Sequence, residues 1–258
     1  MPLVPAILQN ITAGAPRLAA RLYAIDKFLT EIPPPESILE IGPGLGDLSA
    51  HLVERFPSAR LVLSEISSEA ARILEERFKN QARISISQAD ILFGDRGTEQ
   101  FDLVIACEVF EHIEDDCTGL RSVAALLRDG GHFIFSAPCH MRKWQSADVF
   151  AGHFRRYERE ELVQKLERSG MEIKHLWTFG FPTVNLLQPF REIYYRSRNR
   201  AHATDKQTAT KKSGIDRPEW MRRARGPVIA TMLPLLPIER LFWRKELGDG
   251  FLALARKR

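Results

Sequence analysis

Three glycines at alternate positions stand between an apolar segment and an amphipathic one near the N-terminus. The stretch reads Glu40-Ile41-Gly42-Pro43-Gly44-Leu45-Gly46-Asp47. Glycine lets the backbone turn tightly and lets a ligand approach where a Cβ would otherwise stand. A helix that follows such a turn points its N-terminal amides at the same space. A plain strand-to-helix turn needs only one glycine, so the repeated spacing favours a small-ligand site, with the plain turn as the alternative.

The glycine spacing also separates two kinds of cofactor site. A dinucleotide fingerprint is GxGxxG, whose third glycine packs helix against strand, and counted from Gly42 that position is Asp47. The glycines here run GxGxG, and Glu40 lies inside the strand end. Glu65 does not discriminate between the two kinds of cofactor site, because a carboxylate about 20 residues after the glycine turn would bind ribose hydroxyls in either cofactor. The pattern therefore disfavours a nucleotide-linked oxidoreductase.

Alternating apolar and amphipathic segments place this turn in a parallel α/β sheet. Their periodicity predicts strands at 37–42, 59–66, 83–90, 101–109 and 132–138. Helices are predicted at 17–30, 45–56 and 67–79, the last capped by Ser67 or Ser68. A further helix follows residue 109 and runs to about Leu127, ended by Asp129-Gly130-Gly131. The strand–helix order, repeated over five strands, predicts a doubly wound sheet with helices on both faces.

The second half of the chain is less regular. Residues 139–157 are interpreted as a loop over the carboxyl edge of the sheet, followed by a helix over 158–169 capped by Gly170 and a sixth strand over 171–180. A final strand is predicted at 251–257, after Gly248-Asp249-Gly250. Residues 181–247 form a long interruption, for which we expect mostly helices and one disordered stretch near 199–218.

Composition is that of an ordinary globular protein. Of 258 residues, 44% are hydrophobic and 27% charged. No stretch approaches the roughly 18 apolar residues that cross a membrane, and the N-terminus lacks the basic start of a secretory signal. Cys107, Cys117 and Cys139 have no CxxC spacing, which argues against disulfides or a zinc knuckle and fits a reducing compartment. We expect a cytoplasmic protein.

Charge is distributed unevenly along the chain. Residues 191–258 hold 17 Lys/Arg and 7 Asp/Glu, whereas the rest hold 20 and 26. A basic surface could meet nucleic acid, anionic lipid or an anionic substrate. No recognised RNA or DNA module is present, so no specific nucleic-acid partner is expected. Within 227–247, one helical face of apolar residues favours core packing, with a lipophilic substrate or a peripheral membrane contact as alternatives; it comprises Leu233, Leu236, Leu241 and Trp243.

Taken in order, the motifs resemble those of class I S-adenosylmethionine-dependent methyltransferases. Beyond Glu40-x-Gly42-x-Gly44-x-Gly46 they are Glu65, Asp90-Ile91, Phe101-Asp102-Leu103-Val104, Glu108-Val109-Phe110-Glu111-His112-Ile113 and Gly130-Gly131. The resemblance covers about 37–180, with 250–257 as the last strand, and 152–173 is similar to the ubiquinone-type small-molecule branch. It implies a Rossmann-like, seven-stranded, mostly parallel sheet with an antiparallel last strand. The expected single domain has an N-terminal helical segment (1–36), a cofactor-binding core (37–180), a basic helical insert or lid (181–247) and the final strand (248–258).

The resemblance also implies a role for each matching residue toward S-adenosylmethionine, whose product is S-adenosylhomocysteine. Gly42, Gly44 and Gly46 would pass along the methionine part of the cofactor, and Glu40 would order the turn and the amino group. Cys107 and Glu108 would close the site near the methionine part. Glu65 would accept from both ribose hydroxyls, with Ile66 packed on adenine. Asp90 would accept from the adenine amine, with Ile91 lining the ring. A helix-capping role for Asp90 and a plain buried role for Cys107 are the structural alternatives.

The function expected is transfer of a methyl group to a small molecule, more favourably to oxygen than to nitrogen or carbon. A base is needed only where the acceptor loses a proton, and the candidates are His112, His140 and His153. An orienting or core role for His112 and a solvated or hydrogen-bonded loop role for the other two are the alternatives. No GxSxG elbow is present, and Asp115-Asp116 lacks supporting ligand spacing, so no metal is expected. A lipid-linked or anionic acceptor, and a non-catalytic cofactor-binding or scaffold protein, remain as alternative functions.

Overall fold

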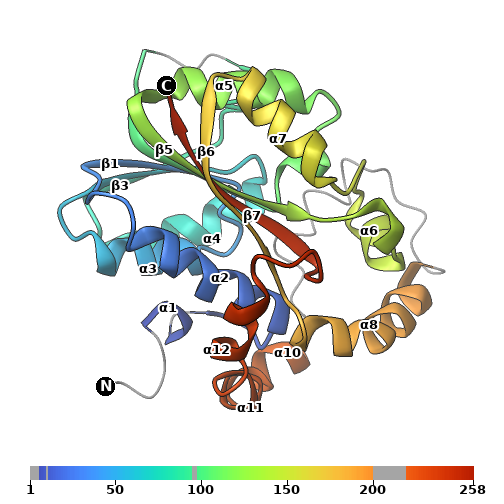
Figure 1. The fold of residues 1–258 in the computed structure, drawn as a ribbon. Helices are drawn as coiled ribbons and strands as arrows, with labels where there is room; N and C mark the ends of the chain where they lie inside the picture. The colour runs from blue at the N-terminus through green and yellow to red at the C-terminus, as the bar shows by residue number, and fades with distance from the viewer. Residues whose placement is uncertain (1–5, 10, 95–97, 200–218) are drawn as a thin grey trace.

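A seven-stranded mixed sheet forms the centre of the protein (Figure 1). The computed structural model describes residues 6–9, 11–94, 98–199 and 219–258. The strand order is β3-β2-β1-β4-β5-β7-β6. The strands are β1 Ser37–Ile41, β2 Arg60–Ser64, β3 Ile84–Ser87, β4 Phe101–Cys107, β5 Leu127–Pro138, β6 Met171–Phe179 and β7 Gly250–Lys257.

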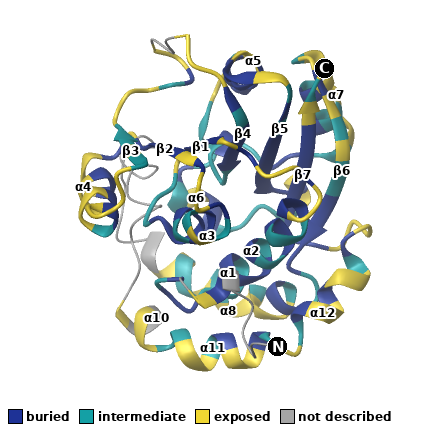
Figure 2. Cartoon of the chain, turned by 90° about the vertical axis from the view of Figure 1, so that its left-hand side faces the viewer, coloured by how far each residue is buried: buried dark blue, intermediate teal, exposed yellow. Residues whose placement is uncertain are grey.

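The pairing of the strands confirms the expected fold class. The first five pair in parallel, and β7 lies antiparallel between β5 and β6. All residues of β1 are buried, and the central strands are buried throughout most of their length (Figure 2). Their nearly continuous apolar sequences are what a parallel sheet covered on both faces requires.

Helices cover both faces of this sheet (Figure 1). The longer ones are α2 Pro16–Leu29, α3 Asp47–Arg55, α4 Ser68–Phe78, α5 Asp116–Leu126, α7 Arg159–Arg168 and α8 Thr183–Asn199. The shorter ones are α1 Ala6–Gln9, α6 Ser146–Ala151, α10 Glu219–Arg223, α11 Arg225–Met232 and α12 Leu236–Glu239, with 3-10 turns η1 Phe110–His112, η2 Met141–Lys143 and η3 Arg240–Phe242. One apolar cluster joins the sheet to α2, α3, α4, α11 and α12, and the other joins it to α5 and α7.

Two predicted boundaries can be compared in detail. Ser67 is confirmed as a cap, because its hydroxyl accepts a hydrogen bond from the Ala70 amide at 3.4 Å. The predicted helix stop at Asp129-Gly130-Gly131 is wrong. The helix α5 already ends at Leu126, and the glycines lie in an irregular start of β5, where pairing jumps from Leu127 to His132. Gly130 has φ 76° there, and its carbonyl accepts a hydrogen bond from Arg256. Its left-handed conformation therefore belongs to the irregular start of the strand and not to a helix end.

The segment after β5 is more ordered than a loop. Residues 139–157 contain η2 and α6, and Gly152, with φ 75°, ends α6. The prediction of a segment near the carboxyl edge is right, but the helical turn was missed because six residues are too short to show periodicity. Beyond β6, the described part of 181–247 is mostly helical, as expected. The predicted disordered stretch lies, from residue 200 to 218, outside the described residues.

The apolar residues predicted as a face within 227–247 mostly enter the core. Leu236 and Trp243 are buried, and the Trp243 ring stacks on Trp177 at 4.6 Å between centroids. Core packing is therefore the correct alternative for these side chains, whereas Leu241 is 75% exposed. No helix within the described ranges is both long and apolar enough to cross a membrane.

Candidate active site

A cavity of about 280 Å³ opens at the carboxyl ends of β1 and β4. In a doubly wound sheet this is the place where the strand order reverses and ligands bind. The glycine turn and the end of β4 form one wall, and the opposite wall comes from α2, η1, α6, the segment after it, and α8. Lining residues include Gly42, Pro43, Gly44, Cys107, Glu108, Glu111, His112, Arg17, Arg21, Asp148, His153, Arg156, Arg191 and Tyr195.

The glycine turn has the geometry that its spacing predicted. Gly42, Gly44 and Gly46 have φ values of 66°, 58° and 76°, a region open to glycine at little cost. A Cβ on Gly42 would stand 2.7 Å from Cγ2 of Val109, which is too close for any other residue without movement. The turn is therefore held against the segment after β4, and only glycine fits it.

The carboxylate of Glu65 ties the turn to the end of β2. Its Oε2 accepts from the Gly44 amide at 3.1 Å, and its Oε1 accepts from the Ser67 amide at 2.9 Å. Burial raises the pKa of this carboxyl above its ordinary value, although the two amide hydrogen bonds act to lower it. Each oxygen retains capacity for a further hydrogen bond, which is what the expected ribose contact needs.

Glu40 is a buried carboxyl beneath the same turn. It is 4% exposed, and the Ser49 hydroxyl in the first turns of α3 donates to its Oε2 at 2.6 Å. Burial raises the pKa of Glu40 to about 7. Its predicted role in ordering the turn thus has a physical basis in the link to α3.

At the end of β4, the cavity wall carries a thiol and a carboxylate. Burial raises the pKa of Cys107 to about 12, so this residue is a neutral thiol. Glu108 has φ 59°, unusual for a residue with a side chain, and its carboxylate pairs with Arg17, with Arg21 at 3.4 Å. Burial acts to raise the pKa of Glu108, but the two guanidinium groups outweigh it, so its pKa lies below the ordinary value.

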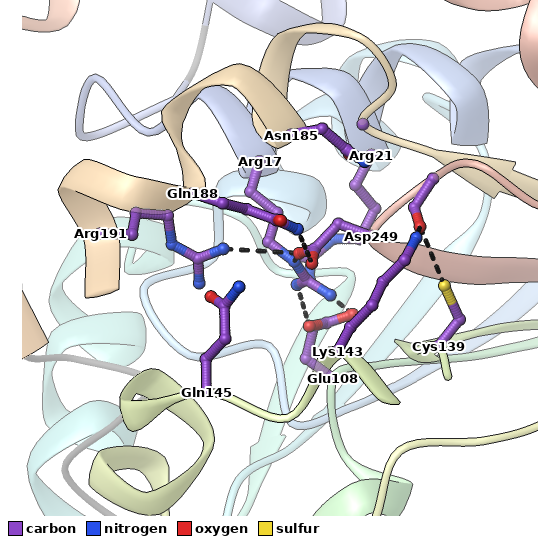
Figure 3. Close-up of polar contacts among 12 residues, drawn as sticks. Arg17, Arg21, Glu108, Cys139, Lys143, Gln145, Asn185, Gln188, Arg191 and Asp249 are labelled. Atoms are coloured by element: carbon purple, nitrogen blue, oxygen red, sulfur yellow. Dashed lines mark hydrogen bonds and ion pairs between the residues drawn. The ribbon is translucent and has the colours of Figure 1, made fainter. Parts of the chain in front are cut away.

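An aspartate just before β7 binds cations from three segments, and Figure 3 shows two of these cations, Arg17 and Arg191. The carboxylate of Asp249 accepts from Arg17 at 2.7 Å, from Arg156 at 3.4 Å and from Arg191 at 3.4 Å. It is fully buried, and although burial acts to raise its pKa, the three guanidinium groups hold it below the ordinary value. Asp249 thereby fixes α2, the segment after α6, and α8 around one wall of the cavity.

The residues expected around adenine lie outside the cavity lining. Asp90 uses Oδ1 to accept from the amides of Leu92 and Phe93, both at 3.2 Å. Residues 91–94 form a turn and not a helix, so these contacts close a turn, and they are not the helix cap that was the structural alternative. Ile66 is 49% exposed and Ile91 half-buried. The adenine contacts of Ile66, Asp90 and Ile91 stay predictions.

Two of the three candidate histidines meet at the cavity wall. The rings of His112 and His153 are edge to face, with centroids 4.7 Å apart. Nδ1 of His153 lies 2.9 Å from Oδ1 of Asp148. Burial acts to raise the pKa of Asp148, but the hydrogen bonds from His153 and Arg156 hold it below its usual value. The charged carboxylate only accepts, so Nδ1 of His153 carries a hydrogen, and its Nε2 lies 3.9 Å from Oε1 of Glu111.

The third histidine is elsewhere. His140 is buried, with Nδ1 2.9 Å from Oε2 of Glu158 and Nε2 3.5 Å from Glu246, and it does not line the cavity. It lies between these carboxylates and the ring of Phe251, which agrees with the hydrogen-bonded loop role that was its alternative. Its candidacy as the base stays a prediction.

Comparison with known proteins decides the family. A methyltransferase domain model matches residues 15–176, which is more than half of the chain. The chain belongs to this methyltransferase domain family. It is 33% identical over 96 residues to an uncharacterised methyltransferase of Mycobacterium tuberculosis, covering 37% of this chain and 47% of that protein. It is 26% identical over 103 residues to a malonyl-[acyl-carrier protein] O-methyltransferase of Paenibacillus, covering 38% and 37%.

Solved structures agree on the fold of the methyltransferase. Coclaurine N-methyltransferase, bound to N-methylheliamine and S-adenosylhomocysteine, superposes with a TM-score of 0.61 at 15% identity, covering 100% of this chain and 82% of that chain. The regions matched in the two relatives above span less than half of their length.

Three potential metal ligands of the methyltransferase lie together in the cavity wall. Ligand atoms of Glu111, His112 and His153 are within 4.8 Å of one another, a grouping that sequence analysis did not anticipate. Burial and the charge of Glu108 raise the pKa of Glu111 well above its ordinary value. The expectation of no metal stays a prediction.

Sequence analysis missed most of the charged side chains of the methyltransferase site. Arg17 and Arg21 are four residues apart on α2, and that spacing alone places both on one helix face. Asp249 stands between two glycines before an apolar strand, which marks it as unusual without revealing its partners. Asp148 and Arg156 had no signal, because their pairing depends on the fold of 139–157.

Proposed function

We propose that the methyltransferase uses S-adenosylmethionine to methylate a hydroxyl oxygen of a small-molecule acceptor, with His153 as the base. The observation that carries the proposal is the pair of His153 with Asp148 at the cavity wall. Its orientation leaves Nε2 as the hydrogen-bond acceptor, which is what removal of a hydroxyl proton requires and transfer to a neutral amine does not.

Several features of the cavity suit the cofactor. The glycine turn offers an approach free of Cβ atoms. Glu65 lies outside the cavity lining but contacts this turn through the Gly44 amide, and its oxygens would accept ribose hydroxyl hydrogens there. Arg17 Nη2 and Arg21 Nε are buried and have no hydrogen-bond partner among the described residues. Buried donors of this kind are costly unless a ligand satisfies them, and the carboxylate of the methionine part is a suitable acceptor. When bound, the cofactor supplies an electrophilic methyl group on a sulfonium.

The side chains around the cavity then have distinct tasks. His153 Nε2 accepts the proton of the acceptor hydroxyl as the oxygen becomes nucleophilic, and Asp148 stabilises the imidazolium that results. Burial and the nearby His153 lower the pKa of His112 to about 3, so this ring stays neutral and acts in orientation. Helices α2, α6 and α8 close the opposite wall and exclude water, which favours an aligned displacement.

An acidic group on the acceptor would suit the same wall. Arg191 lines the cavity and is about one-third exposed, with a 3.4 Å contact to Asp249. A guanidinium that is partly free binds carboxylate or phosphate well. We therefore include an anionic group in the proposed acceptor class, whether borne by a soluble metabolite or by a lipid.

Calorimetric titration tests the cofactor first. S-adenosylmethionine and S-adenosylhomocysteine should bind with micromolar affinity and NAD should not. Glu65→Ala should lose the binding, whereas Glu76→Ala, which removes a carboxylate exposed on α4, should keep it. Binding of NAD alone would overturn the cofactor assignment.

A panel of phenols, hydroxy acids and amines then tests the chemistry, with S-adenosylhomocysteine release as the signal and mass spectrometry to locate the methyl group. We expect transfer to a hydroxyl. Transfer to amines only would refute the oxygen assignment. Tight cofactor binding with no transfer to any compound would favour the non-catalytic alternative.

A further inference from the structure

Helix α8 has an unusual distribution of side chains. The face toward the cavity is polar beyond its first turn. Gln188 and Arg191 contact Asp249 at 3.2 and 3.4 Å (Figure 3), and Tyr195 lines the cavity. The opposite face is apolar. Leu186, Phe190 and Ile193, at helical spacing, are 71%, 70% and 70% exposed. A surface helix normally has the reverse arrangement, so the outward face of α8 requires an explanation.

The exposed apolar surface continues beyond this helix. The ring of Phe181 contacts Phe242 at 4.9 Å between centroids, and the Asn185 amide donates to the Leu247 carbonyl at 2.9 Å. These contacts place the start of α8 beside 242–247, where Leu247 is also exposed, and next to Leu241. We call the exposed side chains Leu186, Phe190, Ile193, Leu241 and Leu247 the outer apolar surface.

Several cations are close to these apolar residues in the chain. Arg240, Arg244 and Lys245 are exposed, and none of them forms a salt bridge to a residue in the described ranges. Arg196 follows Ile193 on α8 and is also exposed. Apolar side chains interspersed with Arg and Lys characterise segments that lie in the headgroup region of an anionic membrane. Each cation near such a surface adds attraction that salt screens.

A second copy of the chain fits this surface less well. A twofold interface brings the same patch of both subunits together, so it would gather the cations of two patches at one interface without supplying anionic partners from these patches. Anionic headgroups instead neutralise them while the apolar side chains enter the acyl boundary. In Figure 1, α8, α11 and α12 lie on the side of the sheet away from α5 and α7.

We infer that the outer apolar surface binds the methyltransferase peripherally to anionic lipid bilayers. Helix α8 would then lie between the bilayer and the cavity, with the cavity about one helix diameter, roughly 10 Å, from the lipid. If the proposed function holds, an amphiphilic acceptor could reach the cavity from the bilayer; the membrane binding itself does not depend on that function.

Vesicle flotation tests the inference without any acceptor. The full chain is mixed with vesicles of phosphatidylglycerol and phosphatidylcholine in equal parts, and with vesicles of phosphatidylcholine alone. We expect binding to the former that weakens with salt, and much weaker binding to the latter. Phe190→Gln with Ile193→Gln should reduce binding by at least about 10-fold, because each side chain contributes substantial apolar burial.

A matched control distinguishes the surface from general hydrophobicity. Ile73→Gln removes an exposed apolar residue from α4 and should bind vesicles as the unmodified chain does. Circular dichroism confirms that each variant is folded. Failure of the unmodified chain to float with anionic vesicles would overturn the inference, as would full binding by the α8 variant. Light scattering that shows a dimer converted to a monomer by the α8 variant, without vesicle binding, would assign the surface to self-association instead.

Discussion

The buried carboxyl of Glu40 should make the stability of the methyltransferase depend on pH. Its pKa is about 7 in the folded chain because of burial, against an ordinary value of 4.5. Between these two pH values the unfolded chain has released the proton and the folded chain retains it, so the free energy of unfolding falls as pH rises through this window. The difference corresponds to about 3 kcal/mol, all of it lost above about pH 7.

Replacement of Glu40 by glutamine isolates this effect. The glutamine side chain keeps an oxygen that accepts from the Ser49 hydroxyl, but it cannot ionise. Urea unfolding of the two proteins from pH 4.5 to 8.5 should show little difference at the acid end. At the alkaline end Glu40→Gln should be more stable by about 3 kcal/mol.

The pH dependence distinguishes this mechanism from a change in packing. Glu76→Gln, at an exposed position on α4, should show no such trend relative to the unmodified chain. A difference between Glu40→Gln and the unmodified chain that is constant across pH would refute the reasoning, since a packing change does not titrate.

Four further predictions concern the site. His153→Gln should lower kcat about 10²–10⁴-fold for a hydroxyl acceptor, whereas His140→Gln, outside the cavity, should leave kcat unchanged; steady-state kinetics decides. Asp249→Asn should lower the free energy of unfolding by about 3–5 kcal/mol, because buried guanidinium groups lose their charged partner, and urea melts measure it. Gly42→Ala should lose cofactor affinity in calorimetry, because its φ of 66° and the Val109 contact forbid a Cβ, and normal affinity would contradict that account. EDTA should leave methyl transfer unchanged, and activity restored only by added metal would revive the Glu111 cluster as a metal site.

The parts of the fold that sequence analysis predicted are those encoded locally. An apolar run of five to seven residues, such as Leu103 to Cys107, is visible in the chain itself, and so are the alternate glycines of the turn. The cap at Ser67 likewise needs only its neighbours. Since these features depend on residues a few positions apart, the order of strands and helices and the position of the turn could be read without the structure.

The charged wall of the cavity depends instead on contacts between distant segments. Arg17 and Asp249 are 232 positions apart, and His153 gains its orientation from Asp148 only because α6 folds as a short helix. Charge type alone predicts such residues to be solvated. Sequence analysis therefore found His153 as a candidate base but could not separate it from His140, whose carboxylate partners are set by the fold.

The polar inner face and the apolar outer face of α8 have one structural cause. Its inner face is polar because the cavity offers Asp249 to Gln188 and Arg191, so the helix has few apolar positions left for the core beyond Val184. Its apolar residues consequently face outward, where nothing in the described chain covers them. The same arrangement that supplies a guanidinium to the acceptor cavity thus leaves the outer apolar surface exposed. A substitution that loosens α8, such as Asp249→Asn, should therefore weaken both catalysis and vesicle binding, whereas Phe190→Gln should weaken only vesicle binding when the acceptor is water-soluble.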